Sequence, residues 1–99
     1  MNKHLNKDRS KDLYRALLLL KTEEEAEKFM DDLCTKNELL AMEQRFQLAL
    51  LLNQGLKYNE ILAQTDASSA TISRVNRSLQ YGAEGYELVF RRMKEDGKE

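Results

Sequence analysis

The apolar residues of the chain recur at helical spacing along nearly its whole length, and no stretch alternates as a β-strand would. Leu13, Leu17 and Leu20, for example, share one face of a first helix. The pattern predicts six helices, over about residues 10–21, 22–34, 35–55, 58–65, 67–81 and 84–94. We therefore expect an all-α protein.

Local capping signals mark where several of these helices begin and end. Thr22 and Glu25 form a capping box, in which the threonine hydroxyl accepts from the N–H of the third residue and the glutamate reaches back. Thr35 and Glu38 repeat this arrangement at the start of the longest helix. Gly55 is expected to end that helix, because glycine accepts the positive φ favoured there.

The segment from Ala67 to Leu79 predicts the most informative helix. Its apolar stripe consists only of Ile72, Val75 and Leu79, spaced i, i+3 and i+7. A short helix over residues 58–65 and a tight turn over 66–68 precede this segment. Helix, turn and slim cationic helix form the helix-turn-helix pattern, whose second helix enters the DNA major groove. The outward face and its flanks carry small residues, hydroxyls and two arginines: Ala70, Thr71, Ser73, Arg74, Arg77, Ser78 and Tyr81.

The charge distribution favours this interpretation over that of an ordinary solvated helix. No acidic residue lies between Ala67 and Ala83, although the chain has 17 acidic and 16 basic residues. Residues 1–11 carry four bases and one acid, whereas residues 22–43 carry eight acids and two bases. An acid-free face suits the base-edge acceptors and phosphates of DNA. Solvated surface is an adequate explanation of the acidic middle.

Two of the predicted helices are apolar on more sides than one small chain can cover. Residues 48–52 are apolar at five consecutive positions, and residues 17–20 at four. A helix that is apolar all round has to be surrounded by other helices, and a 99-residue chain supplies few of them. We therefore expect a homodimer of single-domain chains (residues 1–99), with dimerisation helices at about 10–55 and 84–95 and the helix-turn-helix at about 58–81.

Composition bears on where the protein is located and on whether it is an enzyme. No apolar run approaches the roughly 20 residues of a membrane span, and the N-terminus lacks a signal-peptide core. The lone Cys34 fits a reducing compartment, so we expect a cytoplasmic protein that makes no membrane contact. A single histidine, His4, and the lack of a glycine-rich phosphate loop or His/Cys cluster argue against an enzyme and predict neither a metal site nor a cofactor.

Four runs of residues carry a resemblance to a known family: Leu33–Thr35, Gln44–Phe46, Ala70–Arg77 and Tyr81–Tyr86. With these runs the chain resembles the Trp repressor superfamily from Thr35 to about Met93, and most of all its YerC/YecD group. The resemblance implies a six-helix Trp repressor-like fold and an intertwined homodimer whose two helix-turn-helix heads read DNA.

The resemblance also assigns roles along the second helix of the helix-turn-helix. It implies that Ser69, Ala70 and Ser73 approach base edges, and that Arg77 and Gln80 lie near phosphates. Combined with the outward face, the expected DNA-binding residues are Ser68, Ser69, Ala70, Thr71, Ser73, Arg74, Arg77 and Gln80.

Trp repressor holds its tryptophan co-repressor between two arginines, with hydroxyls at its polar end, so the resemblance implies an effector pocket here. Where the family has a glycine that lets the indole ring lie flat, this chain has Val75, whose methyl groups would overfill the slot. We therefore do not expect tryptophan to bind. Either DNA is bound without an effector, or another small anionic molecule uses the arginines. The matching pocket positions are Thr35, Arg45, Thr71, Arg74 and Ser78.

The sequence thus predicts a sequence-specific DNA-binding transcriptional regulator, in the simplest case a repressor, that reads palindromic double-stranded DNA as a homodimer. Two alternatives stay open: a helical protein-interaction module without a DNA role, and a transposase-type DNA-binding module. An interaction module would explain the wide apolar faces and the near-neutral charge. It would not explain the acid-free face around Arg74.

Overall fold

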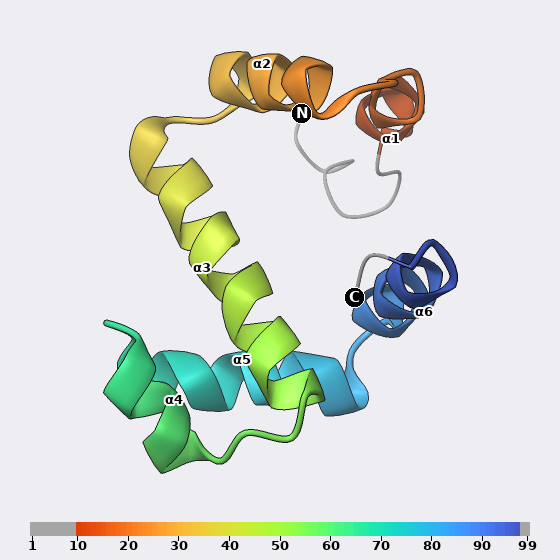
Figure 1. Ribbon diagram of the computed structural model, residues 1–99. Coiled ribbons are helices and arrows are strands. Elements are labelled where there is room, and N and C mark those ends of the chain that lie inside the picture. The colour runs from red at the N-terminus through yellow and green to blue at the C-terminus, as the bar shows by residue number, and fades with distance from the viewer. Residues whose placement is uncertain (1–9, 98–99) are drawn as a thin grey trace. The chain divides into compact units, whose positions relative to one another are not determined.

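The computed structural model describes residues 10–97, and within that range the chain forms six α-helices and no strand (Figure 1). The expected all-α, six-helix fold is confirmed, whereas the dimeric arrangement stays a prediction. The basic stretch at the N-terminus falls largely on residues 1–9. These residues, His4 among them, lie outside the part of the chain that the structure describes. The helices are α1 (Asp12–Leu17), α2 (Glu23–Leu33), α3 (Lys36–Asn53), α4 (Tyr58–Gln64), α5 (Ser69–Tyr81) and α6 (Gly85–Glu95).

The internal contacts of the chain fall into two compact units, residues 1–39 and 40–99. The first unit contains α1, α2 and the first turn of α3. The second contains the rest of α3 together with α4, α5 and α6. The expectation of one domain over residues 1–99 stays a prediction.

The predicted capping boxes begin α2 and α3. Thr22 Oγ1 accepts a hydrogen bond from the backbone N of Glu25 at 3.1 Å, and Glu25 Oε1 accepts from the backbone N of Lys21 at 2.8 Å. The glutamate therefore reaches one residue further back than expected. At α3 the box is complete, because Thr35 Oγ1 accepts from Glu38 N at 3.1 Å and Glu38 Oε1 accepts from Thr35 N at 2.8 Å.

α1 is shorter than the sequence pattern predicted, because it ends at Leu17 and not near Lys21. The N–H groups of Leu19 and Leu20 donate to carbonyls three residues back, at 3.0 and 3.2 Å, which tightens the chain into a turn. The N–H of Lys21 is already held by Glu25 at the start of α2. The apolar spacing continues through Leu20, so the pattern alone extended the helix too far.

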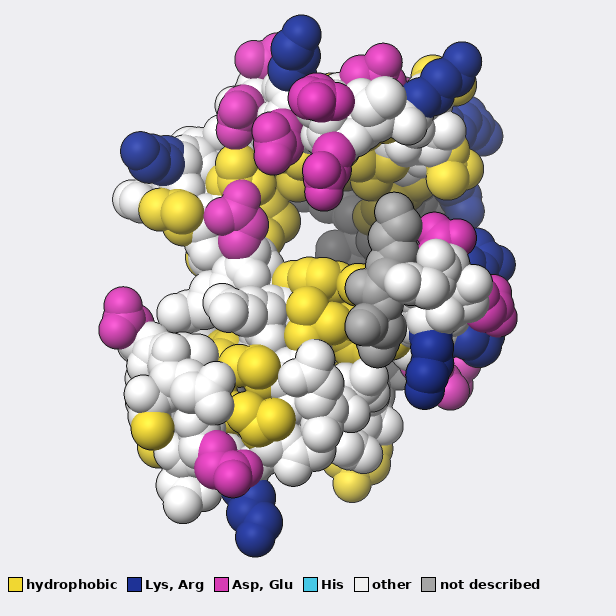
Figure 2. Space-filling model, viewed as in Figure 1, with side chains coloured by type: hydrophobic (Ala, Val, Ile, Leu, Met, Phe, Trp, Pro, Cys, Tyr) yellow, Lys and Arg dark blue, Asp and Glu magenta, His cyan; other side chains and the backbone are white. Residues whose placement is uncertain are grey.

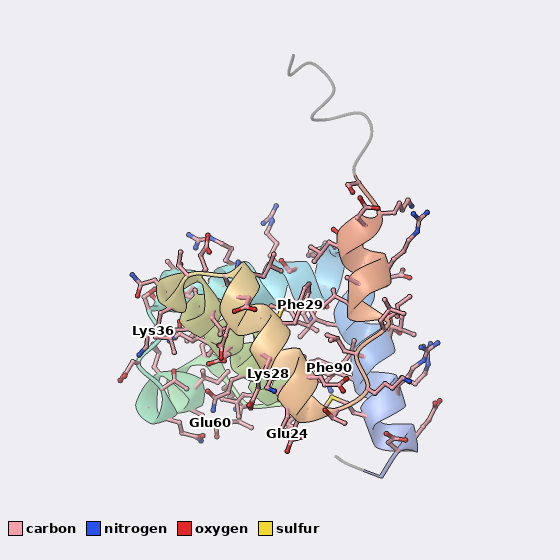
Figure 3. All side chains as sticks on the ribbon, turned by 90° about the horizontal axis from the view of Figure 1, so that it is seen from above. Glu24, Lys28, Phe29, Lys36, Glu60 and Phe90 are labelled. Atoms are coloured by element: carbon pink, nitrogen blue, oxygen red, sulfur yellow. The ribbon has the colours of Figure 1, made fainter. Side chains whose placement is uncertain are left out.

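None of the described side chains of the first unit is buried. Leu18 and Leu19 expose 85% and 75% of their surface, and Leu33 exposes half. Acidic side chains gather over α2 in the space-filling view (Figure 2). Glu24 and Lys28, labelled in Figure 3, lie one turn apart on this helix.

The buried core lies in the second unit. It joins Leu48 and Ala49 of α3, Ile61 of α4, Ala67 of the turn, Ile72 and Val75 of α5, and Phe90 of α6. Half-buried neighbours, Leu50, Leu51, Leu52 and Leu79 among them, pack around it. The predicted inward stripe of α5 is thus confirmed. Much of the apolar run at 48–52 is covered within its own unit.

Two glycines are placed where the backbone requires them. Gly55 follows α3 with φ +94°, as predicted for the end of the longest helix. Gly82 follows α5, and a Cβ atom there would collide with the carbonyl oxygen of Ser78.

No helix within residues 10–97 is long and apolar enough to cross a membrane.

Candidate nucleic-acid interface

α4 and α5 pack against each other across the turn formed by residues 65–68 (Figure 1). The Thr65 hydroxyl donates to the carbonyl oxygen of Ile61 at 3.0 Å and accepts from the backbone N of Ala67 at 3.3 Å. Ile61 is fully buried and Ala67 nearly so. The turn is therefore tied to α4 through Thr65 and to the core through Ala67, which fixes the direction in which α5 leaves α4.

Ser68 caps the N-terminus of α5. Its Oγ accepts from the backbone N of Thr71 at 3.1 Å and lies 3.0 Å from Thr71 Oγ1. The first turn of α5 contains no acidic residue, although acids there commonly stabilise a helix through its dipole. The Ser68 hydroxyl is thus engaged in the helix's own cap, and the N-terminal end of α5 stays free of negative charge.

The outward face of α5 is accessible along its length. Neither Arg74 nor Arg77 has an ion-pair partner among the described residues. Two guanidinium groups with free donors therefore lie beside short hydroxyls and a methyl group. Contact of these residues with DNA stays a prediction. The exposed members of the predicted DNA-binding set are Ser68, Ser69, Ala70, Ser73, Arg74, Arg77 and Gln80, and Thr71 is half-buried.

A pocket of about 390 Å³ opens beside α5, between α3 and α6. This volume is at the small end of the range of roughly 300–1,000 Å³ found for ligand pockets. Four of the five positions that the sequence resemblance assigned to the effector site line it together, namely Arg45, Thr71, Arg74 and Ser78, and Val75, the residue expected to exclude tryptophan, lines it with them. Thr35 is not among the lining residues. It belongs to the first unit, where it caps α3.

Three further lining residues, Met42, Phe46 and Tyr86, were not predicted. Met42 lies about one turn of α3 before Arg45, and Phe46 directly follows Arg45. Helical spacing could therefore have identified both as pocket residues. Tyr86 comes from α6, and its place is set by tertiary packing. Its ring lies 6.4 Å from that of Phe46 and 5.8 Å from that of Phe90. Phe90, labelled in Figure 3, is the buried residue of α6.

The turn between α5 and α6 positions these aromatic residues. Glu84 has φ 70°, and among the described residues it is the only non-glycine with a positive φ. This left-handed conformation is unfavourable for a side chain of this kind. The turn brings α6 back over α3, where Phe46 and Phe90 pack with their ring centroids 5.6 Å apart. The sequence gives no local sign of this strain.

Arg74 and Val75 relate the pocket to its surroundings in different ways. Arg74 is exposed and belongs both to the outward face of α5 and to the pocket wall. Val75 is only 3% exposed and belongs both to the core and to the pocket wall. Charge in the pocket would therefore act directly on a residue of the outward face.

The described residues contain no group of three or more His, Cys, Asp or Glu side chains that could hold a metal ion. Cys34, at the end of α2, is a free, half-buried thiol.

Comparisons with known proteins agree with this architecture. A family model described as Trp repressor protein matches residues 9–94. The uncharacterized protein YerC of Bacillus subtilis is 47% identical over 83 residues, which are 84% of this chain and 80% of YerC. A TrpR-like protein from Eubacterium eligens has a crystal structure that matches with a TM-score of 0.83 and 46% identity, covering 94% of this chain and 96% of that one. A Staphylococcus aureus protein, provisionally described as a Trp repressor, matches with a TM-score of 0.83 and 42% identity, covering 95% of each chain.

Proposed function

The chain belongs to the Trp repressor family, and from this premise we propose that it is a sequence-specific DNA-binding transcriptional regulator. It acts as a repressor and reads palindromic DNA as a homodimer. The observation that carries the proposal is the outward face of α5, which is exposed, free of acidic side chains and equipped with the unpaired Arg74 and Arg77.

In this proposal α5 lies in the major groove. The small side chains of Ser69, Ala70 and Ser73 let the helix approach base edges closely, where hydroxyls can donate or accept and a methyl group can meet thymine. Arg77 and Gln80 contact phosphates and set the register of the helix on the duplex. The buried Ile72 and the anchored turn before α5 hold the helix in one orientation.

Homodimerisation is supported by apolar side chains that the described chain leaves in water. Each such side chain exposes more than a third of its surface, and covering apolar surface is worth roughly 25 cal/mol per Å². A second copy of the chain would cover them and would place two α5 helices to read half-sites about one helical turn apart. The exposed aliphatic side chains outside the helix-turn-helix are Leu13, Leu17, Leu18 and Leu19 near α1, Leu33 of α2, Leu40 of α3, and Leu88 and Val89 of α6.

Under this proposal DNA binding does not require tryptophan, because Val75, which lines the pocket, stands at the position where the resemblance implies a glycine under the flat ring. Calorimetric titration of the protein with tryptophan is expected to give no heat of binding at micromolar concentrations. The Val75→Gly variant removes the methyl groups and is expected to gain tryptophan binding. Micromolar binding by the unaltered protein would contradict this part of the proposal.

A second candidate for the same pocket is a small anionic effector other than tryptophan. Arg45 and Arg74 both line this pocket, and an anion between them would attract two guanidinium groups at once. Because Arg74 also belongs to the outward face of α5, such an anion would change DNA affinity. This effect is measured by repeating the DNA titration with candidate organic acids present.

The test of the main proposal is a salt titration of duplex DNA binding by fluorescence anisotropy. For a DNA-binding protein the logarithm of affinity falls linearly with the logarithm of salt concentration, because phosphate contacts release counterions. Alanine at a phosphate-contacting arginine reduces that slope by about one, whereas alanine at a base-contacting arginine relaxes sequence preference. We expect Arg74→Ala and Arg77→Ala each to weaken binding.

The matched control is Lys28→Ala, which removes a cation from the acidic helix α2 and is expected to leave the slope unchanged. A protein-interaction module would bind neither duplex DNA nor heparin at low salt. That result, with the protein folded and dimeric, would contradict the proposed function.

A further inference from the structure

A second cleft, of about 520 Å³, lies at the other end of α5, where α5, the end of α3 and α6 meet. Its apolar part consists of Leu52, Leu79 and Phe90, which also belong to the core or pack against it. Its polar part contains the exposed side chains of Asn53, Gln80, Glu87, Arg91 and Lys94. None of the DNA-binding or effector positions discussed above, except Gln80, lines this cleft.

The cations of the cleft are available for an external partner. Among the described residues, neither Arg91 nor Lys94 has a carboxylate within ion-pair distance, although Glu87 lines the same cleft. The two residues are spaced i and i+3 on α6, so they share one side of the helix. Basic and acidic side chains both gather over α6 in Figure 2. The cleft itself carries two cations against one anion.

The position of Gln80 links this cleft to the outward face of α5. Ser73, Arg77 and Gln80 are spaced i, i+4 and i+7, which places them on one stripe of the helix. That stripe runs along α5 and ends at Gln80, where the cleft begins. The guanidinium of Arg91 and the ammonium of Lys94 therefore lie beside the end of the stripe that faces DNA in the proposed function.

We infer that Arg91 and Lys94 form a phosphate-binding rim that extends the DNA contact from α5 onto α6. This inference rests on the proposed function. The rim would bind the sugar-phosphate backbone next to the phosphate that Gln80 approaches. It would add affinity without sequence preference, because phosphate contacts position a protein on DNA but do not read bases. Glu87 would oppose the contact by repelling the same phosphates.

The test compares the salt slopes of DNA binding for the unaltered protein and three variants. The double variant Arg91→Gln, Lys94→Gln removes both cations and keeps side chains of similar length. It is expected to reduce the slope by up to about 1.8 for each protomer, since each phosphate contact contributes about 0.9. Glu87→Gln is expected to tighten binding at low salt. Arg92→Gln is the control, because Arg92 is exposed on α6 but does not line the cleft.

Binding-site selection with the double variant separates a phosphate rim from base readout, and is expected to return the same consensus as the unaltered protein. If the unaltered protein binds DNA and the double variant keeps its slope, the rim is refuted while the proposed function stands. If the double variant changes the consensus, Arg91 or Lys94 reads bases and the rim is also refuted. If the unaltered protein binds no duplex DNA, the proposed function fails and the rim fails with it.

Discussion

α2 and α5 are built by the same local rules but present opposite surfaces to water. They have 11 and 13 residues, and each begins with a hydroxyl that caps the third backbone N–H, from Thr22 and from Ser68. The first turn of α2 consists of three glutamates, whereas the first turn of α5 contains no acid. The two helices therefore differ in their outward residues, and these residues decide what kind of surface each helix can approach.

Because its first turn lacks acidic residues, α5 lacks a stabilising interaction that helices in water commonly have. An acidic residue in the first turn typically contributes about 0.3–1 kcal/mol through the helix dipole. The first turn of α2 has three acidic residues that can contribute in this way, whereas the first turn of α5 has none. Because acids near the N-terminus of α5 would repel phosphates, the absence is explained if this end of the helix lies against DNA.

Making the outward face of α5 resemble that of α2 is expected to have the largest effect. The double variant Arg74→Glu, Arg77→Glu places two acids on the exposed face and leaves the buried Ile72 and Val75 untouched. Loss of each contact costs roughly 1–3 kcal/mol, so DNA affinity should fall by about a hundredfold or more. Fluorescence anisotropy at fixed salt measures this change, and circular dichroism confirms the fold.

The reverse change on α2 provides the control for this variant. Glu27→Gln with Asp31→Asn neutralises two acids of α2, and it is expected to leave DNA affinity within a fewfold of the original. A loss comparable to that of the α5 variant would mean that the two helices do not differ in the way proposed.

α2 and α5 also differ at their C-terminal ends, where a substitution is expected to have a smaller effect. Both helices are followed by a residue with extended backbone, Cys34 after α2 and Gly82 after α5, but at Gly82 a Cβ atom would meet the Ser78 carbonyl. Gly82→Ala should lower the free energy of unfolding by about 1–3 kcal/mol, because the turn that leads to α6 has to shift. Urea denaturation measures the loss.

Gly85→Ala is the matched control, because nothing lies within 4 Å of the added Cβ atom and the residue is the first of α6. Alanine favours a helix over glycine, so stability should stay the same or rise. Equal losses in the two variants would rule out the collision with Ser78 as the cause.

The two capping hydroxyls give the smallest expected effect. Ser68→Ala and Thr22→Ala each remove one hydrogen bond to the backbone at 3.1 Å and should each cost about 1 kcal/mol of stability. Because the Ser68 hydroxyl is engaged in the cap, the consensus selected by Ser68→Ala should match that of the original protein. A changed consensus would mean that Ser68 contacts bases directly.

The sequence predicted those parts of the fold that depend on local signals. The starts of α2 and α3 followed from Thr22 and Thr35, because a capping box is made by residues three apart. The inward stripe of α5 followed from the spacing of Ile72 and Val75. The end of α1 was predicted wrongly, because the chain tightens into a turn at Leu19 and Leu20 although the apolar spacing continues through Leu20.

The candidate site was predictable where it lies on one helix and less so where helices meet. The exposed face of α5 is a property of that helix alone. The contribution of Tyr86 to the pocket depends on the left-handed turn at Glu84. A glutamate does not indicate such a turn, because a positive φ is uncommon for residues other than glycine. The cleft that joins Gln80 to Arg91 was not predicted either, because helical spacing says nothing about which helix lies alongside another.

Selection of binding sites from random duplex DNA by the purified protein, without added ligand, tests most directly whether α5 reads DNA. A two-fold protein that reads DNA through α5 should enrich a palindromic consensus, and the Arg74→Glu, Arg77→Glu variant should enrich none. If the unaltered protein is folded and dimeric but enriches no sequence, α5 does not read DNA unaided, and the proposed function is contradicted.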